Sequence, residues 1–312
     1  MNGSHSPSSR AHLGLVTGVL AVSTASTLIR LAQRAQVDSL AVAAWRLTLA
    51  SLILTPLALA TRRKELRSLT GQELGLALGA GLLLAIHFAS WITSLALTSV
   101  AASVVLVAMN PLFVGLASHL FLNERLSRSM AAGLAVAVAG SAIIGLGDLG
   151  EGGHRLVGDL MALVGALAGA GYFLIGRRLR ARLSLIGYVF PVYAAAALIL
   201  MTMAGVSSTP LSGYPGIAWL WLLLLALVPQ IVGHSSLNWA LRHLTATYVT
   251  LAVLAEPVGS TLLAWVVLGE PPTWATMVGG ALILVGIVIA RQGGPPARTG
   301  QNARLPKSQN RR

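Results

Sequence analysis

A carboxylate stands inside an apolar stretch that is long enough to cross a lipid bilayer. Glu256 lies near the middle of residues 250–271 and is followed directly by Pro257. An ionisable side chain inside a membrane span costs roughly 3 kcal/mol on insertion scales and usually faces a cavity. Proline lacks an N–H and clashes with the carbonyl four residues earlier, so the helix is predicted to kink or open there. Glu256 could bind an amine or a cation, exchange a proton, or act as a structural carboxylate against a neighbouring helix.

A second polar pattern lies in the apolar stretch before it. Gln230, His234 and Asn238 recur at i, i+4 and i+8, so in an α-helix they share one face. Three polar side chains in register favour the wall of a water-filled cavity, and the alternative is interhelical hydrogen bonding. His234 could relay protons because imidazole titrates near neutral pH. Pro229 is expected to loosen this helix.

Histidine and tryptophan share a face farther upstream. His87 and Trp91 are four residues apart in the stretch 74–96. An indole that lines a cavity could pack an apolar or aromatic substrate, or hold a cation over its ring. The alternative for His87 is a packed residue with satisfied hydrogen bonds.

Three further residues complete the candidate site. Arg46 lies about eight residues into an apolar stretch, where it could snorkel to the surface, hold a substrate carboxylate or pair with an acid. Asn110 precedes Pro111 as Glu256 precedes Pro257, so it could line the opposite wall. Tyr172 is also predicted to line the cavity. No metal site and no cofactor are predicted.

The composition identifies the environment of these residues. Of the 312 residues, 55% are hydrophobic and only 10% are charged, and the mean hydropathy is +0.76. A soluble domain carries about 25% charged residues, so the chain is predicted to be an integral membrane protein. The net charge of +13 does not indicate nucleic-acid binding, because the basic residues occupy short loops and a tail. The absence of cysteine excludes disulfides and thiolate metal sites.

Apolar stretches of membrane-spanning length recur along the chain. Because no strand-like alternation persists, an all-α fold with ten transmembrane helices is predicted. The first stretch is expected to be a retained helix and not a signal peptide. Residues 1–12 are predicted to be a cytoplasmic segment, and residues 291–312 a basic, disordered cytoplasmic tail that could touch anionic lipid headgroups. The predicted helices cover residues 13–32, 39–60, 74–96, 100–121, 130–147, 157–177, 185–205, 217–240, 246–268 and 274–290.

Basic residues set the predicted orientation. Of the 22 Lys and Arg residues, 18 lie on the cytoplasmic side if the N-terminus is cytoplasmic. Three, Arg30, Arg34 and Arg155, lie on the other side, and Arg46 lies within a helix. Both termini are therefore predicted to be cytoplasmic.

An internal repeat divides the chain into two halves. Residues 110–140 align without a gap with residues 256–286, which pairs Pro111 with Pro257 and Glu124 with Glu270. The halves, 13–147 and 157–290, would hold five helices each. Because five is odd, the second half enters the membrane from the opposite side. Such inverted repeats are typical of secondary transporters, whose site lies between the halves.

The residues that recur in both halves favour structural tasks. Glu124 and Glu270 fall at helix ends, where they are expected to bond backbone N–H groups or to pair with loop arginines. Glycines allow close helix contact, either inside the bundle or in a homodimer. The glycines that recur at helical spacing within the stretches 130–147 and 274–290 are Gly133, Gly140, Gly279, Gly280 and Gly286.

Two halves that each end in P-x12-E-x8-G-x-A-x4-G resemble the EamA-like family of the drug/metabolite transporter superfamily. The segments "AWRLTLASLILTP", "WITSLALTSVAAS" and "NWALRHLTATYVT" fit the same resemblance, which covers about residues 13–290. The resemblance implies a ten-helix bundle in the plasma membrane (the inner membrane of a bacterium), cytoplasmic ends and mostly export. The family handles amino acids, other metabolites and toxic organic compounds, so no substrate is named. The first half departs from the second in having Asn110 where the second has Glu256.

The pattern as a whole predicts a secondary transporter and not an enzyme. It would export a small metabolite, such as an amino acid, or a drug-like molecule by alternating access, with proton coupling through Glu256 as a hypothesis. The expected partners are this substrate and membrane lipids. No G-x-x-x-x-G-K-[ST] motif is present, which argues against an ATP-driven pump. An intramembrane enzyme is the alternative from another class, although H-E-x-x-H, G-x-S-x-G and cysteine are all missing. A channel or lipid scramblase is the other alternative.

Overall fold

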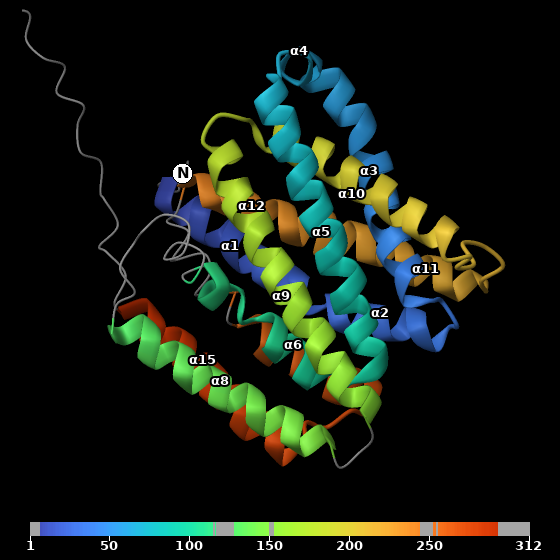
Figure 1. Cartoon of the computed structure of the whole chain (residues 1–312). Coiled ribbons are helices and arrows are strands. Elements are labelled where there is room, and N and C mark those ends of the chain that lie inside the picture. The colour runs from blue at the N-terminus through green and yellow to red at the C-terminus, as the bar shows by residue number, and fades with distance from the viewer. Residues whose placement is uncertain are drawn as a thin grey trace, which may run out of the picture.

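A computed structural model describes residues 7–114, 116, 128–149, 153–243, 252, 253 and 255–292. All regular structure in these ranges is helical, and they contain no strand (Figure 1). The predicted all-α class is therefore confirmed. Glu124, residues 1–6 and residues 293–312 lie outside the described ranges, and with them most of the predicted basic tail.

Uninterrupted helices form the frame of the bundle. Side-chain caps fix where two of them begin: Glu73 N donates to Thr70 Oγ1 at 3.2 Å, and Gly187 N donates to Ser184 Oγ at 3.1 Å. These caps replace the hydrogen-bond partners that the first turn of a helix lacks. The uninterrupted helices are α3 (Ser39–Thr61), α5 (Gly71–Leu97), α8 (Arg128–Leu149), α9 (Gly153–Arg180), α10 (Leu185–Val206) and α15 (Trp274–Gln292), and the short α4 (Arg63–Arg67) follows α3.

Other spans are interrupted. The first consists of α1 (Pro7–Ser23) and α2 (Ala25–Arg34), which meet at a turn at Thr24. Another begins as α6 (Val100–Val107), turns at residues 108–109 and is helical again at 110–114. A third comprises α11 (Gly216–Leu225), the π-helix η1 (Ala226–His234) and α12 (Ser235–His243). The last contains α14 (Glu256–Leu263) and the π-helix η2 (Ala264–Leu268).

Two interruptions change the sequence-based description. The turn at Thr24 was not predicted within the stretch 13–32; there Thr24 Oγ1 donates to the Ala21 carbonyl at 2.7 Å, which competes with regular helical bonding. The loosening expected at Pro229 takes the form of η1, where Pro229 lies inside nine π-helical residues. A π-helix bonds i to i+5, so side-chain directions inferred from α-helical spacing no longer hold.

Recurring glycines join the last helices of the two halves. The helices α8 and α15 lie side by side (Figure 1). A methyl group added at Gly140 would lie 2.5 Å from the carbonyl oxygen of Gly279, and one added at Gly286 would lie 2.6 Å from that of Gly133. In the repeat alignment Gly133 corresponds to Gly279 and Gly140 to Gly286. Exchanging the two halves therefore turns each of these contacts into the other. Such reciprocal contacts are the signature of a two-fold relation, here between the repeats of one chain. The glycines therefore pack inside the bundle.

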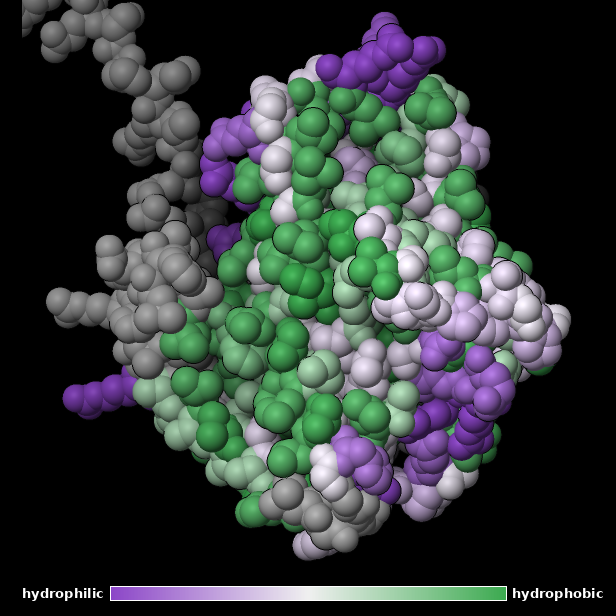
Figure 2. Space-filling model, turned by 45° about the vertical axis from the view of Figure 1, so that its right-hand side comes forward, coloured by the Kyte–Doolittle hydropathy of each residue, from purple (hydrophilic) through white to green (hydrophobic). Residues whose placement is uncertain are grey.

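The surface of the bundle matches a lipid environment. Hydrophobic side chains cover the middle of the face in Figure 2, and hydrophilic ones gather at the top, where α4 lies. Within the described ranges, six helices are long and apolar enough to cross a membrane, and four apolar helices are shorter. The predicted multi-pass membrane protein is confirmed, whereas the count of ten spans stays a prediction. The six long helices are His12–Arg34, Ser39–Thr61, Gly71–Leu97, Gly153–Arg180, Leu185–Val206 and Gly216–Ala240.

The buried core lies between the two halves. Helices α3 and α5 of the first half pack against α10 of the second, and α5 also packs along α9. Large buried side chains fill these contacts, and many of them are aromatic: Phe88, Trp91, Tyr172, Tyr188 and Tyr193. The residues singled out in the sequence consequently meet where elements of both halves converge.

Candidate functional site

Each half supplies one interrupted helix to the centre of the molecule. Asn110 and Pro111 begin the helical segment that follows the turn at 108–109. Glu256 and Pro257 occupy the first two positions of α14, directly after a turn at Ala255. Proline is well tolerated in the first turn of a helix, because the N–H it lacks has no partner there anyway. The two prolines therefore lie where a new helix starts, at equivalent places in the two halves.

The start of α14 is anchored on the break between α1 and α2. Ser260 Oγ donates to the carbonyl oxygen of Ser23 at 3.0 Å, and both residues are buried. A methyl group added at Gly259 would lie 2.8 Å from Ser23 Oγ. A helix break leaves carbonyl groups without intrahelical donors, and inside a membrane these need another partner. Ser260 supplies that partner and fixes the helix that carries Glu256.

A cavity of about 110 Å³ lies between the interrupted helices. Its wall includes six residues that the sequence singled out: His87, Trp91, Asn110, Tyr172, His234 and Glu256. These side chains come from α5, the segment 110–114, α9, η1 and α14. Residues as far apart in sequence as His87 and Glu256 are therefore neighbours in space. The lining extends to the exposed Arg177, near the end of α9.

The cavity lies near the approximate two-fold axis that relates the two halves. The wall contains three pairs of residues that the repeat alignment makes equivalent: Val107 and Val253, Asn110 and Glu256, and Trp91 and Leu237. Phe88 is equivalent to His234, and these two rings touch each other, with centroids 5.5 Å apart. Two equivalent residues can meet in this way only near the axis that relates them.

Hydrogen bonding and stacking fix the imidazole of His87. Its Nδ1 lies 2.8 Å from the carbonyl oxygen of Gly165 on α9. A carbonyl only accepts, so Nδ1 carries the proton in the neutral ring and Nε2 is the free acceptor. The ring stacks on Trp91 at a centroid distance of 5.9 Å. Gly169 allows this approach, since a methyl group there would lie 3.0 Å from His87 Nδ1 and 3.1 Å from Asn110 Oδ1.

Glu256 is half-buried and lines the cavity. Within the described residues it forms no hydrogen bond or ion pair. Asn110 is also half-buried, and its Oδ1 has no hydrogen-bond donor among those residues. The two equivalent positions thus offer polar oxygen atoms to the same space, a carboxylate from one half and an amide from the other.

Asn238 and Tyr172 support the wall from behind. Asn238 is buried, and its Nδ2 donates to the hydroxyl of Tyr172 at 2.9 Å and to the carbonyl of His234 at 2.8 Å. Asn238 does not line the cavity itself. It ties α12 to α9 and holds the end of η1, where His234 lies.

Gln230 and Arg46 also lie outside the cavity wall. Arg46 Nε donates to Gln230 Oε1 at 2.8 Å, and both side chains are fully buried. The expected polar face of Gln230, His234 and Asn238 is therefore not one wall of the cavity: His234 reaches it, and the other two point to Arg46 and Tyr172. Gln230 and His234 both lie in the π-helix η1, which departs from the α-helical spacing behind that expectation. Snorkelling of Arg46 to the surface is wrong as well, since none of the side chain is exposed.

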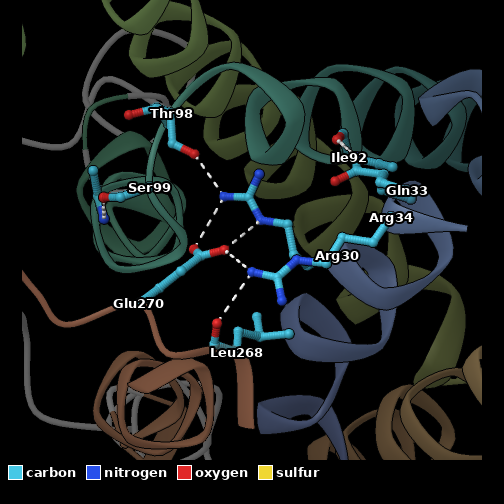
Figure 3. A network of polar contacts seen from close by, with 9 residues as sticks. Arg30, Gln33, Arg34, Ile92, Thr98, Ser99, Leu268 and Glu270 are labelled. Carbon is cyan, nitrogen blue, oxygen red and sulfur yellow. Dashed lines mark hydrogen bonds and ion pairs between the residues drawn. The ribbon is translucent and has the colours of Figure 1, made fainter. Parts of the chain in front are cut away.

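A separate polar cluster lies where α2, the C-terminal end of α5 and the segment between η2 and α15 meet (Figure 3). The carboxylate of Glu270 lies between two arginines of α2, 3.3 Å from Arg30 Nε and 3.0 Å from Arg34 Nη2. Both arginines also donate to backbone carbonyls, Arg30 to Thr98 at 2.9 Å and Arg34 to Leu268 at 3.1 Å. Glu270 thus pairs with arginines as expected, although both of them lie on the helix α2 and not in a loop. The cluster joins the first half to the second.

Some residues of the site could not be recognised from the sequence alone. Phe88, between Arg46 and His234, looked like any apolar residue of a buried helix. Ser23 and Gly165 contribute a carbonyl each, and backbone carbonyls cannot be recognised from residue type. No group of three or more His, Asp or Glu side chains that could hold a metal occurs in the ranges that the structure describes.

Comparison with known proteins shows related transporters. A probable terminal-alkyne amino-acid exporter of Streptantibioticus cattleyicolor is 29% identical over 188 residues, which is 59% of this chain and 61% of that protein. The uncharacterized transporter YdfC of Bacillus subtilis is 24% identical over 183 residues, 58% and 59% of the two chains. The pseudopaline exporter CntI of Pseudomonas aeruginosa is 28% identical over 222 residues, 71% and 76%. The matched segment thus spans about three fifths of the first two relatives.

The fold and the repeat are found in known proteins as well. A solved crystal structure with 23% sequence identity has a TM-score of 0.61 and covers 90% of this chain and 97% of its own, which supports a shared fold. The sequence profile of the EamA-like transporter family matches twice, at residues 9–146 and at residues 156–292. These two matches cover both halves of the chain, and the protein therefore belongs to the EamA-like transporter family.

Proposed function

We propose that this chain is a secondary transporter that exports a small amino-acid-type metabolite or a drug-like compound by alternating access. The observation that carries the proposal is the cavity between the two halves, lined at equivalent positions by Asn110 and Glu256. Transporters with inverted repeats bind substrate at such a junction, near the middle of the membrane. The names of two relatives, an amino-acid exporter and a pseudopaline exporter, support an export function.

The proposed topology follows from the helices and the basic residues. The six long and four shorter apolar helices would be the ten spans, five in residues 13–147 and five in residues 157–290. Both termini would be cytoplasmic, in the plasma membrane, the inner membrane of a bacterium. The cavity lining would then extend toward the cytoplasmic side at Arg177, while Glu270 and its arginines close the other side. This arrangement supports an inward-facing state, and a homodimer stays a prediction.

Glu256 would couple export to proton entry. A carboxylate that binds either a proton or a substrate ammonium group, but not both, exchanges one for the other. Its position on the cavity wall, without a hydrogen bond or ion pair among the described residues, supports this role. His87 and His234 line the same cavity and would complete the proton path.

Counterflow in proteoliposomes tests the proposal. Vesicles preloaded with unlabelled amino acids or cationic drugs should accumulate the matching radiolabelled compound, and export should accelerate when the receiving side is more acidic. Glu256→Gln should abolish the acceleration, while Asp38→Asn, which removes an acid outside the cavity, should not. Counterflow requires a carrier, so wild-type protein that releases every compound without exchange would point to a channel.

A further inference from the structure

The guanidinium of Arg46 has an unusual environment. The side chain is fully buried, and only its Nε has a hydrogen-bond acceptor, Gln230 Oε1, at 2.8 Å. Nη1 and Nη2 have no hydrogen-bond partner among the described residues. One face of the guanidinium lies on the ring of Phe88, with its carbon 4.1 Å from the ring centroid. The two nitrogens that could bind a carboxylate in parallel are therefore the two without an acceptor.

The surroundings of Arg46 are rich in donors. The Nε2 amide of Gln230 and the hydroxyls of Tyr193 and Ser235 also lack well-formed hydrogen bonds among the described residues. Tyr193 lies next to both Gln230 and Ser235 and interacts electrostatically with Arg46. These groups come from α3, η1, α10 and α12 and converge on one place. All of them can donate, although the two hydroxyls can also accept, and beside the positive guanidinium the set matches an anion with several acceptor atoms.

A buried charge without a counter-ion is destabilising by several kcal/mol, so an anion that meets Arg46 during transport would be bound strongly. Glu256 interacts electrostatically with Arg46 but forms no hydrogen bond with it. The helix of Glu256, α14, packs mainly on α1 and α6, whereas α3 packs mainly on α10, α5 and η1. Glu256 therefore lies near Arg46 without bonding to it, and Nη1 and Nη2 stay available to a second anion.

Phe88 separates Arg46 from the cavity. Its ring contacts the guanidinium, and it also lies 5.5 Å from the ring of His234 and 6.2 Å from that of Trp91, both of which line the cavity. A rotation of this one side chain would join the donors around Arg46 to the cavity. Phe88 is thus the ring that contacts both the guanidinium and two side chains of the cavity wall.

We propose that Arg46, together with Gln230 and Tyr193, forms a carboxylate subsite beside the cavity, and that the substrate is zwitterionic. The substrate carboxylate accepts hydrogen bonds from Nη1 and Nη2 of Arg46, in the fork geometry that guanidinium and carboxylate share. Its ammonium group binds Glu256 on the opposite wall. This inference rests on the proposed transport function of the cavity and narrows its substrates to amino acids and their derivatives.

Binding measurements with matched ligands test the subsite. Purified full-length protein is titrated in a thermal-shift assay with a panel of amino acids, each also as its amide and as its decarboxylated amine, because a ligand raises the melting temperature by mass action. Wild-type protein should bind at least one free acid roughly 10- to 100-fold more tightly than its amide, as expected for hydrogen bonds to a charged group. Arg46→Gln should remove this preference by weakening the free acid alone.

The controls separate binding from folding. Arg34→Gln removes an arginine that is half-exposed and paired with Glu270, and it should keep the full preference for the acid. Arg46→Lys retains the positive charge but not the two parallel donors of the guanidinium, so its preference for the free acid over the amide should be intermediate. This variant keeps the subsite testable if Arg46→Gln does not fold. Equal binding of acid and amide by wild-type protein, or an unchanged preference in Arg46→Gln, would overturn the subsite.

The same titrations distinguish the subsite from the transport proposal. Counterflow of amines or amides without any preference for free acids would refute the subsite and leave the transporter standing. Neither binding nor counterflow of any amino acid, amine or cationic drug would refute both.

Discussion

The helix starts at Asn110 and at Glu256 occupy equivalent places in the two halves, but they offer different chemistry to the cavity. Both follow a turn, and both have proline as the next residue. The helix that packs beside each start carries Gly169 in one case and Ser23 in the other. One half then presents an amide and the other a carboxylate.

The difference shows which residues build the architecture and which make it specific. Residues that recur, such as Pro111 with Pro257 or Gly140 with Gly286, define the shared frame. The side chains expected to contact a substrate do not recur, since Glu256 is matched by Asn110 and Trp91 by Leu237. A symmetric frame can thus hold an asymmetric site, as an asymmetric substrate requires.

The largest expected effect is at the two helix starts. Glu256→Asn should lower counterflow roughly 30- to 100-fold, because removing one partner of a buried charged contact costs about 2–3 kcal/mol. Asn110→Ala should lower it less than about tenfold, the loss of a neutral hydrogen bond. The exchange Asn110→Glu with Glu256→Asn should not restore transport, because His87 and Arg46 do not recur. Restored transport would show that the two positions are interchangeable.

The shared frame should respond alike in both halves. Gly140→Ala places a methyl group 2.5 Å from the carbonyl oxygen of Gly279, and the equivalent Gly286→Ala places one 2.6 Å from that of Gly133. Overpacking of this kind costs about 1–3 kcal/mol, so both should lower the melting temperature by similar amounts. Gly75, which has no atom within 4 Å of an added methyl group, provides the control. A clear difference between Gly140→Ala and Gly286→Ala would contradict the two-fold contact.

The cluster around Glu270 should contribute less to stability. Glu270→Gln removes both ion pairs, and since the side chains are partly exposed the expected loss is about 1 kcal/mol. Arg30→Gln should destabilise more than Arg34→Gln, because Arg30 is 15% exposed and Arg34 is 50% exposed. The effects should shrink at high salt, which screens exposed charges. Melting temperatures measured at low and high ionic strength check this order, and equal effects of the two arginines would be at odds with it.

The smallest effect is expected behind the cavity wall. Tyr172→Phe removes the acceptor of Asn238 Nδ2 and should cost about 1 kcal/mol. Asn238→Leu removes the donor, and the double variant should be less destabilised than the sum of the two by about that amount. Thermal melts of the four proteins give this coupling energy, and strict additivity would mean that the bond does not contribute.

Much of the fold was predictable because membrane spans are long and apolar. The all-helical class, the multi-pass membrane protein, the family and the two-part architecture followed from hydropathy and from the recurrence of Pro111 and Glu124 at Pro257 and Glu270. The turn at Thr24 could not be predicted, since the competition between a hydroxyl and the backbone depends on what packs against the break. The loosening at Pro229 was expected, but the π-helical form was not.

The sequence by itself determined which residue types lie inside the membrane and which positions repeat, because both are properties of the linear chain. It identified Glu256, His87, Trp91, Asn110, Tyr172 and His234, and the tertiary structure brought these six together around one cavity. Only the tertiary structure placed Gln230 beside Arg46 and Asn238 beside Tyr172, because these partners come from α3 and α9, helices far away in the sequence. The position of Phe88 between a buried guanidinium and the cavity likewise depends on how α3, α5 and η1 pack, which no single segment of the chain encodes.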